Sequence, residues 1–136
     1  MSESARSWAI LFVDDEERSR KYFIRFFGKE REVLTAADGR EGLELYREHR
    51  DRIGIVVTDQ MMPAMSGLEL LGKIEAEGSP AVRILSSAYA DTADVEEATG
   101  SGLIDFLITK PWDLAALESL LEEAWACWQR RMSSAA

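Results

Sequence analysis

A run of mostly β-branched residues over positions 53–58 ends at Asp59 and is followed at once by a loop that contains Pro63. An apolar run of this kind is typical of a strand buried on both faces, as in a parallel sheet covered by helices. In such open sheets, ligands bind at the carboxyl ends of the strands. Asp59 therefore lies where the chemistry of this fold would take place, although aspartate is also a common turn residue at a strand end.

Strand and helix patterns alternate five times along the chain. Short apolar runs predict strands, and each is followed by a segment with the apolar spacing of an amphipathic helix. Glycine and proline groups such as Gly78-Ser79-Pro80 separate the elements. We expect strands at about residues 8–13, 33–36, 53–58 and 81–85, and a fifth strand within residues 103–108. We expect helices at about residues 16–27, 39–50, 67–76, 91–99 and 114–128.

This alternation, with short connections, predicts an α/β fold in which helices cover both faces of a parallel sheet. We expect a doubly wound (βα)5 domain of the flavodoxin-like type, with a parallel five-stranded sheet in the order 2-1-3-4-5. This order brings the first and third strands together at a switch point. Residues 1–131 are expected to form the domain, and residues 132–136 a short tail or a domain boundary.

Composition narrows the possible functions. The 136-residue chain is 46% hydrophobic, which is enough for one buried core, and its formal net charge of −9 argues against direct binding of nucleic acid. Its apolar runs are shorter than the roughly 20 residues of a membrane helix. The N-terminal residues lack a secretory signal pattern, and the single Cys127 fits a reducing compartment, so we expect a cytoplasmic location.

Polar residues follow four of the expected strands at the edge where ligands would bind. Crowded carboxylates repel one another unless they share a cation, and oxygen-only ligands favour a hard ion such as Mg²⁺. A lysine can hold an anionic oxygen, a hydroxyl can donate to another, and an aspartate can act as the nucleophile in phosphoryl transfer. The residues at this edge are Asp14, Asp15, Asp59, Ser87 and Lys110.

Four segments in this order resemble the receiver domain of two-component response regulators. The resemblance covers about residues 7 to 130, and the endings Tyr-Ala-Asp and Lys-Pro-Trp-Asp are similar to those of receivers in NtrC-type and HD-GYP-type regulators. The matching segments are Val13-Asp14-Asp15-Glu16, Thr58-Asp59-Gln60-Met61-Met62-Pro63 with Met65 and Gly67, Ser86-Ser87-Ala88-Tyr89-Ala90-Asp91, and Thr109-Lys110-Pro111-Trp112-Asp113.

The resemblance implies a role for each acidic residue. Asp59 would accept a phosphoryl group from a phosphohistidine on a sensor histidine kinase or a phosphotransfer protein. Asp15, Asp59 and the backbone carbonyl of Met61 would bind Mg²⁺ directly, and Asp14 would do so through water. Lys110 would contact a phosphoryl oxygen.

Ser87 would supply the hydroxyl that moves toward the phosphoryl group. Ser86 is a rival for this role, but the small Ala88 that follows Ser87 favours Ser87. The resemblance also implies structural roles in the site, including a cis peptide bond before the last of these residues: Pro63, Gly67 and Pro111.

One position departs from the family pattern. Receivers usually carry an aromatic switch residue three positions before the lysine, where this chain has Leu107. Either a bulge re-aims the preceding Phe106 into that place, or the aromatic switch is absent. Met61 and Tyr89 flank the site, where they would either control the access of water to an acyl phosphate or pack at the rim.

The resemblance implies a phosphoacceptor that assists its own phosphotransfer and autodephosphorylation, and not a conventional turnover enzyme. Phosphorylation would shift a two-state equilibrium that controls an output domain or partner outside this chain. Transcription, second-messenger turnover and a single-domain shuttle all remain open as outputs. A homodimer through the face from the fourth strand to the fifth helix is a further expectation, with Trp125 and Trp128 on that helix.

Two other functions compete with this one. A degenerate receiver would serve only as a protein-interaction module, which the intact acidic set disfavours. A small aspartyl-phosphate phosphatase would usually carry a second aspartate two residues after the nucleophile, where this chain has Met61. Dinucleotide enzymes are disfavoured because Asp14-Asp15-Glu16 stands where a glycine-rich fingerprint would follow the first strand.

Overall fold

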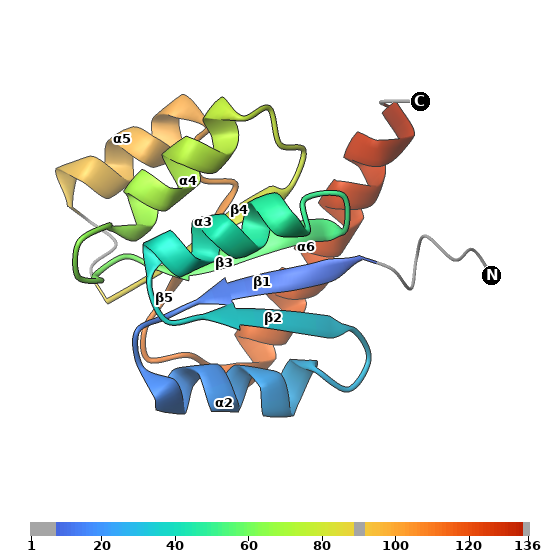
Figure 1. Cartoon of the computed structure of the whole chain (residues 1–136), viewed down its shortest axis with the longest axis horizontal. Coiled ribbons are helices and arrows are strands. Elements are labelled where there is room, and N and C mark those ends of the chain that lie inside the picture. Colours follow the sequence, from blue (N-terminus) through green and yellow to red (C-terminus); the bar gives the residue numbers. More distant parts are fainter. Residues whose placement is uncertain (1–7, 89–91, 135–136) are drawn as a thin grey trace.

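The computed structural model describes residues 8–88 and 92–134. Tyr89 and Asp91, which were expected to flank the site and to begin a helix, lie outside the described residues. Strands and helices alternate through the described chain (Figure 1): β1 Ala9–Val13, α2 Glu17–Phe27, β2 Glu32–Ala36, α3 Gly39–Glu48, β3 Ile53–Asp59, α4 Gly67–Ala76, β4 Val82–Ser87, α5 Ala93–Ser101, β5 Phe106–Thr109 and α6 Leu114–Ser134.

The sheet confirms the expected topology. Its strands pair in the order β2-β1-β3-β4-β5, and each neighbouring pair is parallel. Helices α2 and α6 cover one face of the sheet, and α3, α4 and α5 cover the other (Figure 1). This is the doubly wound arrangement of the flavodoxin-like fold, with the switch point between β1 and β3.

Alternate residues of the central strands enter two separate cores. In β1, Leu11 and Val13 pack toward α3, α4 and α5, whereas Ile10 and Phe12 pack toward α2 and α6. Every residue of β1 and β3 is buried, which explains why both strands read as uninterrupted apolar runs. The two strands pair with one register shift between Ala9 and Ile10, and from there the pairing is continuous to Val13 opposite Thr58 at their carboxyl ends.

The fourth and fifth strands end later than the sequence pattern predicts. β4 continues through Ser87, because Ser86 and Ser87 pair in register with the end of β5. β5 begins at Phe106, inside the expected segment 103–108, and ends one residue beyond it; before it, the backbone N–H of Leu103 bonds to the carbonyl of Ala98 at the end of α5, at 3.0 Å. Both serines therefore belong to the sheet.

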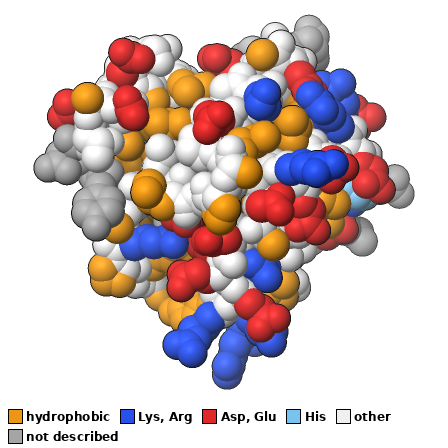
Figure 2. Space-filling view, turned by 60° about the vertical axis from the view of Figure 1, so that its left-hand side comes forward, with side chains coloured by type: hydrophobic (Ala, Val, Ile, Leu, Met, Phe, Trp, Pro, Cys, Tyr) orange, Lys and Arg blue, Asp and Glu red, His pale blue; other side chains and the backbone are white. Residues whose placement is uncertain are grey.

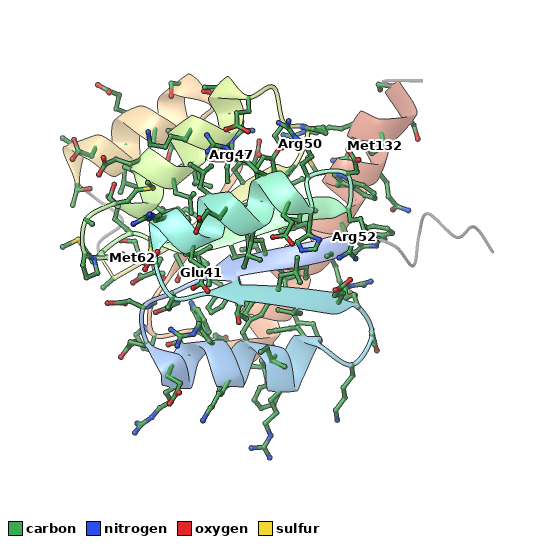
Figure 3. The ribbon with its side chains drawn as sticks, in the orientation of Figure 1. Glu41, Arg47, Arg50, Arg52, Met62 and Met132 are labelled. Carbon is green, nitrogen blue, oxygen red and sulfur yellow. The ribbon has the colours of Figure 1, made fainter. Side chains whose placement is uncertain are left out.

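The last helix is longer than predicted. Residues 132–134, expected as part of a loose tail, form the final turn of α6. Arg131 anchors this end, since its guanidinium donates to the carbonyls of Pro80 and Ala81 at 3.1 and 3.2 Å and pairs with Asp105 at 2.6 Å. In Figure 3, Met132 lies at the opposite end of the molecule from Met62, which is in the loop after β3.

Three tryptophans close the core at this far end. Trp125 and Trp128 of α6 are half-buried, and their rings stack on the buried Trp8 at centroid distances of 4.1 and 5.7 Å. The guanidinium of Arg31 lies 4.7 Å from the ring of Trp8. Trp125 and Trp128 therefore pack inward against the start of β1.

In the part of the chain that the structure describes, none of the helices combines the length and the apolar character needed to cross a membrane.

Candidate functional site

Three carboxylates meet at the carboxyl edge of the sheet. Asp14 follows β1 and Asp59 ends β3, and the two strands pair so that Val13 lies opposite Thr58. Asp14, Asp15 and Asp59 each offer a carboxylate oxygen, and these oxygens lie within 4.8 Å of one another. Asp14 and Asp59 are buried, whereas Asp15 is exposed, so the cluster is open to solvent on the Asp15 side.

Lys110 joins this cluster from the end of β5. Its Nζ lies 3.2 Å from Asp14 Oδ2 and 3.2 Å from Asp59 Oδ1. The backbone N–H of Lys110 donates to the carbonyl of Ser87 at 2.9 Å, and the peptide bond to Pro111 is cis, as expected. The lysine is thus held to β4 by its backbone while its ammonium group bridges two buried carboxylates.

The electrostatics of the cluster leave it with an excess of negative charge. Burial raises the pKa of Asp59 above its usual value; Lys110 opposes this shift, while Asp14 and Asp15 add to it. Burial alone would lower the pKa of Lys110, but the charges of Asp14 and Asp59 outweigh that effect and raise it. The lysine therefore stays charged, and its single charge does not compensate the three carboxylates around it.

This donor set fits a hard divalent cation. Carboxylate oxygens are the ligands that Mg²⁺ and Ca²⁺ prefer, and a site with few protein ligands and access to water suits Mg²⁺ in particular. Asp14 is oriented for such a role because its Oδ1 accepts a hydrogen bond from the backbone N–H of Glu16 at 2.9 Å. Met61, two residues after Asp59, lies in the adjoining loop with its side chain 68% exposed.

The loop after Asp59 depends on a glycine at its far end. A Cβ at Gly67 would lie 2.3 Å from the backbone oxygen of Asp59, a distance that a side-chain atom cannot occupy. Gln60 ties the two ends together, because its side-chain oxygen accepts from the N–H of Leu68 at 2.9 Å and its carbonyl accepts from the N–H of Gly67 at 3.0 Å. The carbonyl of Pro63 closes a tight turn by accepting from the N–H of Met65 at 2.7 Å.

The two serines at the end of β4 lie on opposite faces of the sheet. Strand alternation puts Ser87 on the face of Leu85, toward α3, α4 and α5, and Ser86 on the face of Ile84, toward α2 and α6. Both are buried. Ser86 Oγ accepts a hydrogen bond from Trp112 Nε1 at 2.9 Å, so its hydroxyl is engaged on the α2 and α6 side.

The position expected for an aromatic switch holds an aliphatic residue. β4 and β5 pair in continuous register from Ile84 with Phe106 to Ser87 with Thr109, which leaves no bulge between these pairs to re-aim Phe106. Phe106 packs with the core under α2 and α6, and Leu107 packs with the core under α3, α4 and α5. Leu107 therefore stands on the Ser87 face, and Phe106 does not replace it.

Three residues that shape the site were not predicted from the sequence. Arg20 of α2 donates to the backbone carbonyl of Asp14 at 2.7 Å, Gln60 bridges the loop after Asp59, and Trp112 bonds to Ser86. Trp112 stood in the recognised Lys-Pro-Trp-Asp segment, which offered a signal.

In Figure 2, which turns the carboxyl edge of the sheet toward the viewer, acidic and basic side chains lie together near the middle of the face, and basic ones gather at the bottom, where α2 lies.

Comparison with known proteins agrees with this geometry. The family model described as "Response regulator receiver domain" matches residues 10–122. The hydrogenase transcriptional regulatory protein HoxA of Cupriavidus necator is 32% identical over 80% of this chain, which spans 22% of that protein. The transcriptional regulatory protein GlrR of Escherichia coli is 31% identical over 85% of this chain, which spans 26% of that protein. The chain thus covers about a quarter of the length of these relatives.

Solved structures resemble the whole described fold. The signal receiver domain of an HD domain-containing protein from Pseudomonas fluorescens superposes with a TM-score of 0.84 at 25% identity, over 92% of this chain and 99% of that one. A chain of the CheX-CheY-BeF3-Mg²⁺ complex from Borrelia burgdorferi gives a TM-score of 0.78 at 30% identity, over 87% of this chain and 89% of that one. The chain with this fold and this acidic cluster belongs to the receiver domains of two-component response regulators.

Proposed function

We propose that Asp59 is the phosphoacceptor of this receiver domain and that it takes a phosphoryl group, in a Mg²⁺-dependent reaction in the cytoplasm, from a phosphohistidine on a sensor kinase or a phosphotransfer protein. One observation carries the proposal: the Lys110 ammonium group lies 3.2 Å from both Asp14 and Asp59, within a cluster of three carboxylates at the carboxyl edge of the sheet. Phosphoryl transfer relies mainly on positioning and charge neutralisation; this cluster supplies the positioning, and Lys110 together with a bound divalent cation would supply the neutralisation.

In the proposed reaction, a carboxylate oxygen of Asp59 forms a bond to phosphorus while the bond between phosphorus and the donor imidazole nitrogen breaks. The imidazole leaves with the electron pair of that bond, and the product on Asp59 is an acyl phosphate. Lys110, released from one of its carboxylate contacts, would hold a phosphoryl oxygen. The Ser87 hydroxyl would donate to another phosphoryl oxygen from the end of β4.

Asp14, Asp15, Asp59 and the backbone carbonyl of Met61 are the groups that would hold the metal ion. A bound Mg²⁺ would neutralise charge on the phosphoryl oxygens during transfer. Its fit rests on the donor set, because three carboxylates offer oxygens within 4.8 Å of one another and a single lysine contacts two of them. A structure that matches this chain at 30% identity is described as a complex with BeF3 and Mg²⁺, which supports the same chemistry here.

The output lies outside this chain. The matched relatives include transcriptional regulators and a cyclic di-GMP phosphodiesterase of Thermotoga maritima, so we propose that this receiver controls a linked or separate effector of one of these kinds. Autodephosphorylation, with Met61 and Tyr89 tuning access of water, and a homodimer through the face from β4 to α6 remain predictions.

Intact-mass measurement tests the proposal directly. The protein is incubated with acetyl phosphate and Mg²⁺, beside an Asp59→Asn variant and a matched Asp51→Asn control at an exposed position away from the site. The native chain and the Asp51 variant should each gain one phosphoryl group, which chelation of Mg²⁺ prevents, and the Asp59 variant should gain none. A folded native chain that gains nothing would contradict the proposal and favour a degenerate receiver that only binds partners.

A further inference from the structure

Trp112 contacts the wall of the site in two places. Its indole Nε1 donates to Ser86 Oγ at 2.9 Å, and its ring centroid lies 5.9 Å from Lys110 Nζ. The second distance is near the outer limit at which an ammonium group is attracted to an aromatic face. Trp112 thus lies against both the strand next to Asp59 and the lysine that bridges Asp59 and Asp14.

Ser86 brings this contact next to the phosphoacceptor. In the register of β3 with β4, Ser86 is the partner of Asp59, and its carbonyl accepts from the backbone N–H of Gln60 at 3.1 Å. Ser86 is fully buried, so its hydroxyl cannot exchange the indole bond for one to bulk water without cost. A shift in the backbone at Asp59 therefore reaches the indole through one residue.

On its other side, Trp112 belongs to an aromatic chain that reaches the surface. Its ring centroid lies 5.5 Å from Phe12, 6.3 Å from Phe23 and 6.3 Å from Tyr22. Tyr22 in turn lies 4.5 Å from Phe26, and these two side chains of α2 are 39% and 43% exposed. The chain connects the site to the exposed face of α2.

Two hollows border the ring of Trp112. A hollow of about 300 Å³ lies between Trp112 and the α2 residues Arg18, Ser19 and Tyr22. A second hollow, of about 370 Å³, lies on the side of Lys110, Pro111 and Ala88. Among the described residues, Trp112 packs on Phe12 and Phe23 and borders these two hollows, and it is only half-buried, unlike a side chain enclosed in a core.

We infer that Trp112 is a positioning residue of the phosphorylation site and that it transmits the state of Asp59, through Ser86 and Lys110, to the aromatic face of α2. The inference rests on the proposed function of Asp59. On the opposite face of the sheet, the position where receivers carry an aromatic switch holds Leu107, which packs against the core under α3, α4 and α5. Trp112, whose ring is hydrogen-bonded to Ser86, thus lies on the other side of the sheet, toward α2.

The indole N–H resonances test this directly. The chain has four tryptophans, and their indole cross-peaks are recorded on the ¹⁵N-labelled protein before and after addition of beryllium fluoride with Mg²⁺. The Trp112→Phe variant, which lacks one cross-peak, assigns the peak of Trp112. The Trp112 cross-peak should move by more than its linewidth, while those of Trp8, Trp125 and Trp128, beyond the other end of β1, should stay within theirs. Ser86→Ala should shift the Trp112 cross-peak before beryllium fluoride is added, and it should reduce by at least half the shift that beryllium fluoride causes.

Kinetics supply a second readout. Trp112→Phe keeps an aromatic ring but loses the N–H, and it should change the rate of phosphoryl loss by about 3- to 10-fold, the effect of one hydrogen bond. Ser86→Ala should change it similarly, and the double variant should change it no more than either single variant, because both remove one interaction. Trp125→Phe, at the far end of the sheet, is the matched control and should leave the rate unchanged.

The outcomes separate the two proposals. A native chain that is phosphorylated on Asp59, with an unmoved Trp112 cross-peak or with additive effects of the two variants, would overturn the role of Trp112 and leave that of Asp59 intact. A folded native chain that takes up no phosphoryl group would overturn both.

Discussion

The Nζ of Lys110 lies 3.2 Å from Asp59 Oδ1, although 51 positions separate the two residues in sequence (110 − 59). The contact exists because β5 and β3 end at the same edge of the sheet, with β4 between them. A lysine in this place offsets part of the charge of the buried carboxylates, and in the proposed reaction it would also hold a phosphoryl oxygen. If the proposal holds, stability and function depend on the same contact.

Removing this lysine should destabilise the metal-free domain. Lys110→Ala leaves Asp14 and Asp59 buried without a compensating charge, and we expect a loss of about 1–3 kcal/mol in the free energy of unfolding at neutral pH. Urea denaturation in the presence of a chelator measures the change. Lys73→Ala, at an exposed position in the last turn of α4, is the matched control and should change stability little. Equal stability of native and Lys110 variant would argue against the compensating role.

Neutralising Asp59 should have the opposite effect, with a defined pH dependence. The raised pKa of Asp59 means that the folded chain holds this proton more tightly than the unfolded chain does. The stabilisation that comes from binding this proton is complete below the pKa of Asp59 in the unfolded chain. It is lost as the pH rises through the pKa of Asp59 in the folded chain. Without metal, Asp59→Asn should therefore melt at a higher temperature than the native chain at pH 7, and this advantage should shrink as the pH falls toward 4. A constant difference between the two melting temperatures across this range would contradict the assignment.

The strand order and the meeting of the acidic residues at one edge of the sheet could be predicted from the sequence, because buried apolar runs mark where the strands lie. The apolar runs before Asp14 and Asp59 are buried on both faces and mark two strands of a parallel sheet, whose carboxyl ends meet at one edge and bring the two carboxylates together. Lys110 follows from the same logic, since its strand ends at that edge. The register shift of β1 against β3 between Ala9 and Ile10 is not encoded in that pattern. Once the fold is known, the faces of Ser86 and Ser87 follow from strand alternation.

Side-chain contacts across the sheet were less predictable. The bond from Trp112 to Ser86 depends on how the chain turns after β5, and no periodic pattern in the sequence encodes that turn. The last turn of α6 was missed because residues 132–134 carry little apolar character, whereas their helix is held by the polar contacts of Arg131 with Pro80, Ala81 and Asp105. Pattern analysis detects burial better than it detects such anchors.

Magnesium should stabilise the fold through the acidic cluster. At a Mg²⁺ concentration about ten times its dissociation constant, binding to the folded state adds roughly 1.4 kcal/mol to the free energy of unfolding. Asp15→Asn should reduce this gain while leaving the metal-free stability nearly unchanged, because Asp15 is exposed. Thermal melts with and without Mg²⁺ measure both quantities. A full Mg²⁺ response in the Asp15 variant would exclude Asp15 from the metal site.

Gly67 should tolerate no side chain. Its substitution by alanine forces a Cβ against the backbone oxygen of Asp59, and we expect a loss of roughly 2 kcal/mol or more, as in other overpacked sites. Gly72, in the same helix, is the matched control, because a Cβ there would meet none of the described heavy atoms within 4 Å beyond its chain neighbours and the backbone of its own helix. Gly72→Ala should be neutral or stabilising by about 0.5–1 kcal/mol. Equal effects of the two substitutions on the urea midpoint would contradict the close approach at Gly67.

The identity of the phosphorylated residue tests the central claim most directly. After reaction with acetyl phosphate and Mg²⁺, borohydride reduces an aspartyl phosphate to homoserine, and tandem mass spectrometry of the digested chain locates the altered residue. We predict homoserine at position 59 alone, only when Mg²⁺ is present, and none in Asp59→Asn. Homoserine at position 14 or 15, or an unaltered Asp59 in a chain that has gained a phosphoryl group, would contradict the account.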